Sequence, residues 1–545
     1  MNSYVRLGNR ALALSVAFLA SNFGQARDQS KPIVDVRFDA PYSQVESSYG
    51  DEWAPTWGRD DVLYTGNDDG SSFGGIAVNA IAFGKLAGGD PTQLKGTSIN
   101  GMTDYREPEQ HGPEGARWKS IDSYKLNGVL YRFMPCGVGP EQSQSSCIKS
   151  SADDGKSWAS GSTRTRALFS NPNFRTLGFI ALRPELEALL GEAGEYIYAA
   201  SYVGVRDGED TYILGRVRAT QFLKANPADW SFQQPDHSWK AALDQAAPAP
   251  NSMGVGADGA NWKITNSYSV NGALYMFITR CHYPWQSGDA MHRHIFRDSS
   301  IIKSSDDGRT WTRPTEDNYQ RPMFPGTRFG APYFVWYGKD GAAEVDNADR
   351  YVYAVSNNGH FEAGDDYVLG RVLRTKLPQL SATDWSYYKT GDGMQDGSWT
   401  ASLEKAAPIL SNPQQSSMTG MTYISALDRY VMVLWHYSYV SFQTAILHKD
   451  LSTVLEFFEA PKPWGPWTKI KSFNTGQFGW YTPILGQRFQ ATANSTDVTA
   501  ILYATGFTSN PEGGLEHGRY KLNFMPLTLS TKPLPHNNPS FVGGR

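Results

Sequence analysis

The stretch Ser304-Ser305-Asp306-Asp307-Gly308-Arg309-Thr310-Trp311 decides the fold, because an earlier copy stands at Ser151-Ala152-Asp153-Asp154-Gly155-Lys156-Ser157-Trp158. In each copy the first aspartate can accept hydrogen bonds from the amides of a turn, and the glycine permits a positive φ. The tryptophan is a large apolar side chain that can pack between neighbouring sheets. Two copies at matched positions favour this structural interpretation over a catalytic or metal-binding role for the aspartates.

These turns belong to a longer internal repeat with two alternating unit types. In the first type, Arg117-Trp118-Lys119 and then Asn127–Tyr131 recur as Asn261-Trp262-Lys263 and Asn271–Tyr275. In the second type, Tyr196–Ala199 and Tyr212–Val217 recur as Tyr351–Ala354 and Tyr367–Val372. Three further, more divergent units are found at Trp53–Thr65, Met418–Trp467 and Phe478–Ala504. The chain thus contains seven units of roughly 60 to 75 residues each.

Each unit contains three or four short runs of period two, separated by turn residues, which is typical of small antiparallel sheets. One such sheet cannot bury both faces alone, whereas sheets arranged radially can. We therefore predict an all-β fold, a single β-propeller over residues 33–530 with seven four-stranded blades. Five or six blades are the alternatives if some units are decorations. The last unit lacks a fourth strand, so we expect Ile33–Phe38 to pair with it and close the ring.

The ends of the chain and its charge bear on location and partners. Residues 1–26 resemble a secretory signal peptide, with Arg6 and Arg10, a short apolar run, and small residues before a cleavage position at Ala26. We expect a secreted or periplasmic monomer that does not contact the membrane after cleavage; a retained anchor is the alternative. Residues 531–545 form a C-terminal tail. The net charge of −4 gives no reason to propose a nucleic acid as a partner.

The chain has three cysteines. Cys136 and Cys147 flank a loop between two predicted strands, and export would permit a disulfide between them. The sequence leaves the bonded and the reduced states equally open. Cys281 is then unpaired, and we expect it to be buried.

The repeated motifs resemble two groups of known propellers. The aspartate turns are similar to the Asp boxes of the sialidase superfamily. The combination of Trp53–Trp57, the Leu-Gly-Arg-Val strands and Ala460–Trp467 resembles more closely a bacterial propeller family long catalogued as uncharacterised, some members of which are endo-D-arabinanases. The resemblance touches most of residues 50–530 and implies a propeller that acts on glycans. The chain departs from both groups, because the arginine triad of sialidases is not found and one more pair of units is present.

Topology indicates where a functional site would lie. In a four-stranded blade, the loop leading into the first strand and the loop between the second and third strands lie on the same face, whereas the aspartate turns lie on the other. Most of the ten histidines fall in loops of the first two kinds. Because loops carry function on a rigid scaffold, we expect a carbohydrate site on that face.

Glycoside cleavage needs two carboxyl groups, one acting as acid and the other as base or nucleophile. We predict Asp51 as base or nucleophile, Glu362 as acid, and Asp69 orienting one of them. The alternative for each is a solvated loop carboxylate or a turn former. Asn67-Asp68-Asp69-Gly70 is especially typical of a turn.

Other side chains expected on the same face could bind a sugar. Several tryptophans could stack on sugar rings or pack between blades, two equivalent lysines could donate to the substrate or be paired internally, and histidines and an arginine complete the set: Trp53, Trp118, Trp262, Trp285, Trp480, Lys119, Lys263, His282, His360, His436 and Arg328. Asp289–His294 contains a His-x-His pair, but no second ligand pair stands out, so we expect neither a metal nor a cofactor.

The sequence therefore favours a secreted glycoside hydrolase with a carboxylate-lined axial pocket. A glycan-binding propeller that lacks catalysis and a polysaccharide lyase using His or Tyr as base are the alternatives. Carboxyl oxygens roughly 5 to 10 Å apart in one cavity would favour hydrolysis, and carboxylates scattered over the rim would favour binding. A His/Tyr pair beside a basic cluster would favour the lyase.

Overall fold

The computed structural model of the chain describes residues 30–535 except 75–78, 103–120, 137–144, 153–156, 158, 161–166, 172–173, 175–176, 181–194, 207–208, 237, 247–248, 251–260, 283–294, 315–321, 344–349, 391–397, 438–451, 476–477 and 509–520. Regular structure in this part of the chain is almost wholly β, as predicted, and it is organised in seven sheets. The predicted signal peptide and most of the C-terminal tail lie outside the described residues. No helix within the described ranges is both long and apolar enough to cross a membrane.

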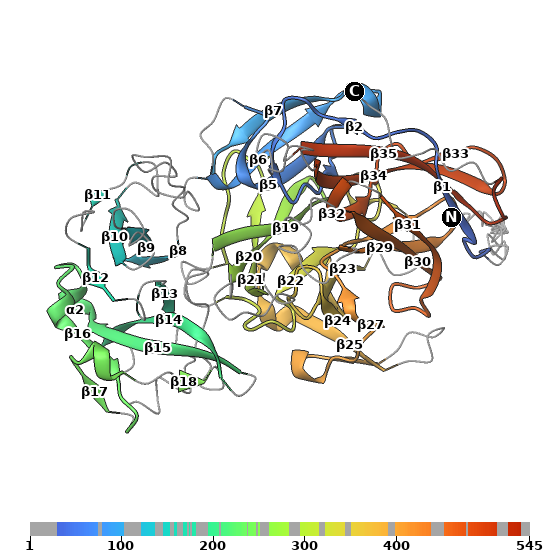
Figure 1. Ribbon diagram of the computed structural model, residues 1–545. Helices are drawn as coiled ribbons and strands as arrows, with labels where there is room; N and C mark the ends of the chain where they lie inside the picture. The colour runs from blue at the N-terminus through green and yellow to red at the C-terminus, as the bar shows by residue number, and fades with distance from the viewer. Residues whose placement is uncertain are drawn as a thin grey trace, which may run out of the picture.

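Five of the seven sheets form the main body in Figure 1. Their strands are, for sheet 1, β3 (Tyr49–Asp51), β4 (Thr56–Trp57), β5 (Leu63–Ser72), β6 (Asn79–Ala87) and β7 (Lys95–Asn100); for sheet 4, β19 (Asn261–Val270), β20 (Ala273–His282) and β21 (Ile295–Ser304); for sheet 5, β22 (Ala331–Phe334), β23 (Tyr351–Asn357), β24 (Gly364–Leu373), β25 (Trp385–Thr390), β26 (Ser398–Thr400) and β27 (Leu410–Ser416); for sheet 6, β28 (Met421–Ile424), β29 (Arg429–Tyr437), β30 (Thr453–Ala460) and β31 (Thr468–Asn474); and for sheet 7, β32 (Phe478–Leu485), β33 (Ala491–Thr492), β34 (Asp497–Thr508) and β35 (Lys521–Ser530), with β1 (Asp35–Phe38) and β2 (Ser43–Gln44).

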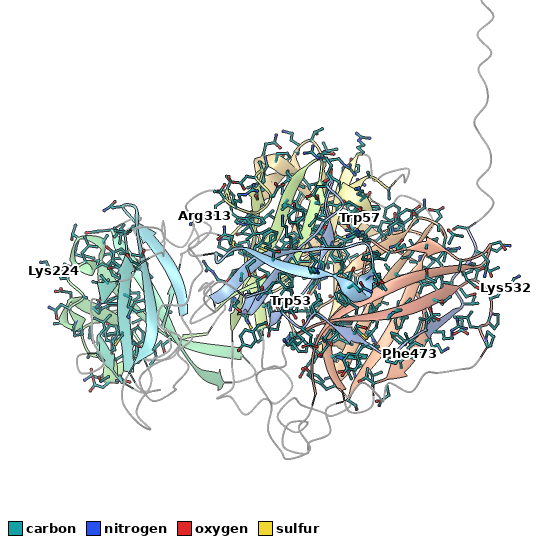
Figure 2. All side chains as sticks on the ribbon, turned by 90° about the horizontal axis from the view of Figure 1, so that it is seen from above. Trp53, Trp57, Lys224, Arg313, Phe473 and Lys532 are labelled. Atoms are coloured by element: carbon teal, nitrogen blue, oxygen red, sulfur yellow. The ribbon has the colours of Figure 1, made fainter. Side chains whose placement is uncertain are left out.

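Sheets 2 and 3 form a separate lobe beside the main body in both Figure 1 and Figure 2. Sheet 2 contains β8 (Ile121–Leu126), β9 (Val129–Cys136), β10 (Ser145–Ser151), β11 (Ala159–Ser160) and β12 (Phe169–Ser170), and sheet 3 contains β13 (Leu177–Ile180), β14 (Tyr196–Arg206), β15 (Glu209–Arg218), β16 (Trp230–Gln233), β17 (Trp239–Lys240) and β18 (Ala249–Pro250). The short helices are α2 (Ala219–Phe222), η1 (Pro91–Gln93), η4 (Pro227–Asp229), η5 (Leu243–Gln245), η8 (Lys339–Gly341), η9 (Leu377–Gln379), η10 (Ala382–Asp384) and η11 (Leu403–Lys405).

The N-terminal strand pairs with the last sheet, as predicted. β1 runs antiparallel to β35, with Asp35 opposite Ser530 and Phe38 opposite Leu527. The pairing gives sheet 7 the outer strand that its own segment lacks. It also joins residues from opposite ends of the chain in one sheet.

Hydrogen bonds link the five sheets of the main body in a closed circuit. Sheet 4 bonds to sheet 1 through Ser269 N and Thr56 Oγ1 (3.0 Å), and sheet 5 bonds to sheet 4 through Phe334 N and Asn266 Oδ1 (2.9 Å). Trp336 N, after β22 of sheet 5, donates to Met421 O of sheet 6 (2.9 Å), and Thr422 Oγ1 of sheet 6 donates to Leu485 O of sheet 7 (2.7 Å). Trp53 N, between β3 and β4 of sheet 1, donates to Thr505 Oγ1 of sheet 7 (3.2 Å). We refer to these sheets as the five-sheet ring. Sheet 1 therefore bonds directly to sheet 4, although sheets 2 and 3 lie between them in sequence.

The lobe has a hydrophobic core of its own. Phe133, Phe169, Phe174, Trp230 and Phe232 pack edge to face in one cluster, and no described residue of the main body belongs to it. All seven predicted units form sheets. Among the described residues, the hydrogen bonds given above connect five of them, and sheet 2 meets sheet 4 where β8 lies against β19. The alternative of five blades plus decorations fits these contacts.

The aspartate turn after β21 has the structural role that the sequence predicts. Asp306 accepts hydrogen bonds from Thr310 N (2.9 Å) and Thr310 Oγ1 (2.7 Å). Gly308 has φ +85° and lies against the Phe83 ring, so that a Cβ there would approach the ring to 2.3 Å. The Trp311 ring meets Phe83 edge to face at 4.9 Å. The turn therefore fastens sheet 4 to sheet 1; its copy at Asp153 lies outside the described residues.

The three cysteines follow the bonded alternative that the sequence left open. Cys147 is disulfide-bonded, whereas Cys281 is a free, buried thiol. Cys136 lies in β9 opposite Ser145, and its side chain is not among those described. The bonded state of Cys147 agrees with a disulfide across this hairpin.

Candidate functional site

The innermost strands of sheets 1 and 4 bring four charged residues together. Asp51 at the end of β3 lies opposite Asp68 of β5. Asp68 is fully buried and accepts hydrogen bonds from Ile264 N at 3.0 and 3.2 Å. Lys263, the residue before Ile264 in β19, places its Nζ 3.9 Å from Asp68 Oδ2. With the buried Glu52, these residues form what we call the carboxyl cluster: Asp51, Glu52, Asp68 and Lys263.

Burial dominates the electrostatics of this cluster. Desolvation raises the pKa of Asp68 well above its ordinary value, the charge of Lys263 acts against this, and Glu52 and Asp51 raise the pKa further. Desolvation, followed by the charges of Glu52 and Asp68, likewise raises the pKa of the buried Tyr333 phenol. Burial and the neighbouring carboxyl groups thus favour the protonated form of Asp68, whereas Lys263 favours the ionised form.

The loop between β23 and β24 carries Glu362 toward the same region. Met418 N donates to Phe361 O (2.8 Å), and Phe296 N donates to Gly359 O (2.6 Å), so the loop is fixed from both neighbouring sheets. The Phe361 ring packs against the rings of Tyr481 (5.7 Å) and Trp435 (4.9 Å).

Tyr481 connects this loop to the carboxyl cluster. Its hydroxyl donates to Asp51 Oδ2 (3.3 Å), while its ring contacts Phe361, the residue before Glu362. Tyr481 of sheet 7 thus connects Asp51 of sheet 1 to Phe361 in the loop of sheet 5.

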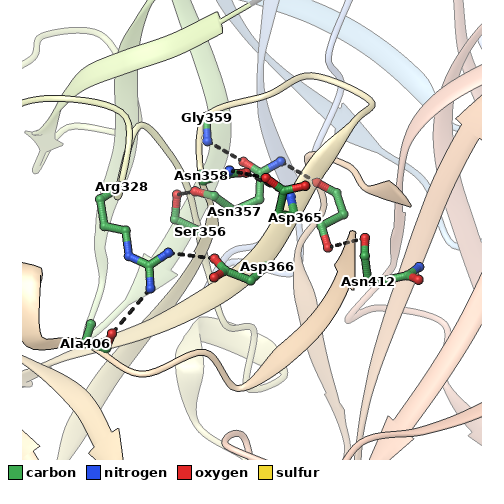
Figure 3. Close-up of polar contacts among 10 residues, drawn as sticks. Arg328, Ser356, Asn357, Asn358, Gly359, Asp365, Asp366, Ala406 and Asn412 are labelled. Atoms are coloured by element: carbon green, nitrogen blue, oxygen red, sulfur yellow. Dashed lines mark hydrogen bonds and ion pairs between the residues drawn. The ribbon is translucent and has the colours of Figure 1, made fainter. Parts of the chain in front are cut away.

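Polar side chains near both ends of the β23–β24 connection bond to one another and to neighbouring segments, as Figure 3 shows for Asn357, Asn358 and Asp366. Arg328 Nη1 binds Asp366 Oδ1 (2.7 Å), and its Nη2 donates to Ala406 O (3.3 Å). Asn358 Nδ2 donates to Asp365 Oδ2 (3.2 Å). Arg328, predicted to bind substrate, is thereby paired within sheet 5, and about 29% of its side chain stays exposed.

Several predicted sugar-binding side chains lie instead in the protein interior. Trp53 is fully buried, and its Nε1 donates to Gly50 O (2.7 Å); Figure 2 shows it within the main body. Trp480 is 1% exposed and meets Tyr42 edge to face. Both therefore pack between strands, which was the alternative interpretation. Lys263 is 4% exposed and paired with Asp68, so it cannot reach a sugar directly.

The remaining predicted residues are placed only in part. His436 in β29 is half-buried, with Nδ1 3.1 Å from Tyr437 O. His360 pairs with Ile295 through an isolated bridge. Asp69, Trp262 and His282 lie in β5, β19 and β20, but their side chains are not described, and Trp118, Lys119 and Trp285 lie outside the described residues altogether. Among the residues that are described, no group of three or more His, Cys, Asp or Glu side chains is placed to hold a metal.

Sequence reasoning missed Asp68, Glu52 and Tyr481. Asn67–Gly70 was expected to be a turn, but β5 continues through it to Ser72, because Asp68 pairs with both Asp51 and Ile81. Cross-strand pairing within sheet 1 here overrides local turn propensity.

Comparisons with known proteins give the following results. No family model matches the chain, and no curated protein matches it. Solved structures similar to it include a putative hydrolase from Bacteroides ovatus, with TM-score 0.26, 11% identity, 75% of this chain and 93% of that chain covered. A GH43 endo-arabinanase from Bacillus licheniformis has TM-score 0.24, 10% identity and coverages of 74% and 92%. A Hadza microbial sialidase has TM-score 0.23, 10% identity and coverages of 83% and 74%. TM-scores this low leave the function to be inferred from the chain's own residues.

Proposed function

We propose that the five-sheet ring is a five-bladed propeller and that the protein is a secreted glycoside hydrolase. Asp51 serves as base or nucleophile, and Glu362 serves as the general acid. The observation that carries the proposal is the link from Asp51 through Tyr481 and Phe361 to the Glu362 loop. Glycoside cleavage needs two carboxyl groups flanking one bond, and this link connects the segments that carry Asp51 and Glu362.

The carboxyl cluster supports this division of roles. Asp51 is half-buried, whereas Glu52 and Asp68 are buried beside it. Asp68 cannot touch a sugar, because it is fully buried, but it can orient Asp51 across the β3–β5 pairing. Asp68 therefore takes the orienting role that the sequence assigned to its neighbour Asp69. The Tyr481 hydroxyl fixes the other side of Asp51.

Export completes the proposal. Residues 1–26 would direct secretion, and the mature protein would meet polysaccharide outside the cytoplasm. Of the residues predicted to bind sugar, Arg328 and His436 keep part of their side chains exposed and can contribute to binding.

The test is hydrolysis of a polysaccharide panel by the mature protein and by two variants. Asp51→Asn and Glu362→Gln should each lose at least about 100-fold in rate on natural polymers, since a positioned acid or base contributes about 10² to 10⁴. An aryl glycoside with a good leaving group separates the roles, because its departure needs little protonation. Glu362→Gln should keep most of its activity on that substrate, whereas Asp51→Asn should not.

Asp365→Asn is the matched control, because Asp365 lies in the same region but is exposed. It should retain near wild-type rates. Full activity of Asp51→Asn on every substrate would overturn the proposal. If the wild type binds a glycan without turnover, the protein is a glycan-binding propeller. If the products have unsaturated ends, it is a polysaccharide lyase.

A further inference from the structure

A second polar cluster lies at the other ends of the innermost strands, where β4 and β32 finish. Trp57 N donates to Gln487 Oε1 (3.0 Å), and Trp57 Nε1 donates to Asp61 Oδ1 (2.9 Å). Arg488 Nη2 binds the second oxygen of Asp61 at 3.1 Å. Gln487 and Arg488 therefore both attach to the same pair, Trp57 and Asp61.

Three buried hydrogen-bond donors near Trp57 and Asp61 have no acceptor among the described residues. Gln487 Nε2, Arg488 Nη1 and Tyr503 Oη are buried and meet no hydrogen-bond partner among the described residues. Gln487 is 2% exposed, and only 9% of the Arg488 side chain is exposed. A buried donor that is left unsatisfied costs about 1–3 kcal/mol. Three such donors in adjacent side chains point to an occupant that accepts hydrogen bonds.

Tyr503 belongs to the same group of donors. Its ring lies directly on Gly486, where a Cβ would come within 2.4 Å of Cε2 and 3.2 Å of the hydroxyl. Only glycine permits this approach. Burial raises the pKa of the Tyr503 phenol, and the charge of Arg488 acts against this. The hydroxyl thus keeps its proton and can donate it.

The local charge identifies the occupant's sign. Lys339 Nζ lies 3.3 Å from Asp61 Oδ1, so Asp61 faces two cations, Lys339 and Arg488. The hydrogen bond from Trp57, with the charges of Arg488 and Lys339, outweighs desolvation and lowers the pKa of Asp61. One carboxylate faces two cations, which leaves one positive charge in this cluster.

We infer that Gln487, Arg488 and Tyr503 bind a compact monovalent anion of the size of chloride or acetate, beside the contact between sheets 1 and 7. The anion accepts hydrogen bonds from Gln487 Nε2, Arg488 Nη1 and Tyr503 Oη. All three donors belong to sheet 7, and two of the residues also contact sheet 1, through Trp57 and Asp61. This site is independent of the hydrolase proposal.

The test is thermal unfolding of the mature protein in sodium chloride, sodium acetate and sodium gluconate at constant ionic strength. Chloride should raise Tm by about 2–4 °C over gluconate, in a saturable manner, because a ligand that binds only the folded state stabilises it by mass action. A rise in acetate alone would identify a carboxylate as the occupant. Equal Tm values in all three salts at every concentration would overturn the inference.

Two variants distinguish loss of anion binding from a general loss of thermal stability. Arg488→Gln should abolish the dependence on the anion. Gln487→Glu should also abolish it while keeping Tm in gluconate at or above the wild-type value, because the new carboxylate can accept from Trp57 N and pair with Arg488. Arg309→Gln is the control, since the Arg309 side chain is 67% exposed, and it should respond as the wild type does.

Crystals soaked in bromide give a direct readout. An anomalous peak beside Gln487 Nε2 and Arg488 Nη1 is expected. A water molecule at that position in crystals soaked in bromide and in crystals soaked in acetate, or an unchanged response in Arg488→Gln, would contradict the inference.

Discussion

Sheet 3 of the lobe and sheet 5 of the ring are built alike but are used differently. In each sheet five strands are paired in the order of the chain, β13 to β17 in sheet 3 and β22 to β26 in sheet 5. A sixth strand, β18 or β27, pairs with the third strand of its sheet. Arg216 lies over the rings of Tyr196 (4.2 Å) and Trp239 (4.3 Å), and Arg371 lies over those of Tyr351 (4.2 Å) and Trp399 (3.7 Å). The framework of a sheet is therefore repeated down to individual side chains.

The difference lies in the loops and in the partners of the innermost strand. Residues 207–208 join the second and third strands of sheet 3, whereas the longer connection 358–363 joins those of sheet 5 and carries Glu362. In the ring, Phe334 of β22 bonds to Asn266 of sheet 4, and Trp336 bonds to sheet 6. In the lobe, β13 packs against β8 of sheet 2. One framework thus serves as a ring member or as half of a lobe, according to what its edge meets.

Removing whole sheets should produce the largest contrast. Replacing residues 103–260 with a flexible linker of about ten residues should leave a folded, secreted ring, because sheet 1 already bonds to sheet 4 through Asp68 and Ile264. Deleting residues 331–416 should abolish folding, because it opens the circuit at sheets 4 and 6. Secreted yield and near-ultraviolet circular dichroism measure both outcomes. An aggregated ring after removal of the lobe would show that the two regions fold as one.

Breaking the buried ion pair of the ring should have the next largest effect. Lys263→Met removes the partner of Asp68, and losing one member of a buried pair costs about 3–5 kcal/mol. Lys119 occupies the equivalent position in the sequence repeat, and we expect Lys119→Met to cost less, because its unit does not belong to the five-sheet ring. Urea unfolding of both variants measures the difference. Equal losses would argue that the lobe depends on its lysine as the ring does.

The loss at Lys263 should also depend on pH. The pKa of Asp68 is raised above its ordinary value of 3.8, so the folded state binds the proton more tightly than the unfolded chain does. This contribution is fully present below pH 3.8 and is lost as pH rises through the folded-state pKa. Lys263→Met raises that pKa further, so its cost should be larger at pH 8 than at pH 4. The double variant with Asp68→Asn should remove most of this dependence.

The repeats predicted much of the framework but not its assembly. Period-two runs and turns such as Ser304–Trp311 located every sheet, and the spare run Ile33–Phe38 indicated the pairing of β1 with β35. Which sheets share a ring could not be predicted, because sheets 2 and 3 carry the same local motifs as sheets 4 and 5. That choice depends on long-range contacts such as Ile264 N to Asp68, which leave no periodic signal.

The sequence predicted some residues of the candidate site and missed others. Asp51 and Glu362 were predicted from the topology of loops, and their placement at one site stays a prediction. Trp53 and Trp480 were ambiguous, because a buried wedge and a sugar platform require the same residue type. Asp68 was assigned to a turn, since the propensity of Asn-Asp-Asp-Gly carries no information on the strands that flank it.

Removing the stacked arginines should lower the free energy of unfolding by a smaller amount. It also tests whether the ring and the lobe unfold together. Arg371→Ala and Arg216→Ala should each cost about 1–2 kcal/mol, because each cation lies over two aromatic rings. If the ring and the lobe unfold separately, calorimetry should show Arg371→Ala shifting one transition and Arg216→Ala the other. Arg→Lys at either position should retain part of the interaction. A single transition that both alanine variants shift equally would contradict the division of the molecule into ring and lobe.

The smallest contrast concerns the aspartate turns. Desolvation raises the pKa of Asp306, but hydrogen bonds from Thr310 and Ser304 and the charge of Arg309 outweigh it, so the pKa is lowered. Its stabilisation is therefore present above pH 3.8 and lost as pH falls through the folded-state pKa. Asp306→Ala should cost about 1 kcal/mol at pH 7 and less at pH 3. Because the Asp306 turn fastens Trp311 to Phe83 of sheet 1, this loss should appear in the unfolding of the ring. Asp153→Ala should lower only the lobe transition, and a matching shift of the ring transition would show that the lobe turn also contacts the ring.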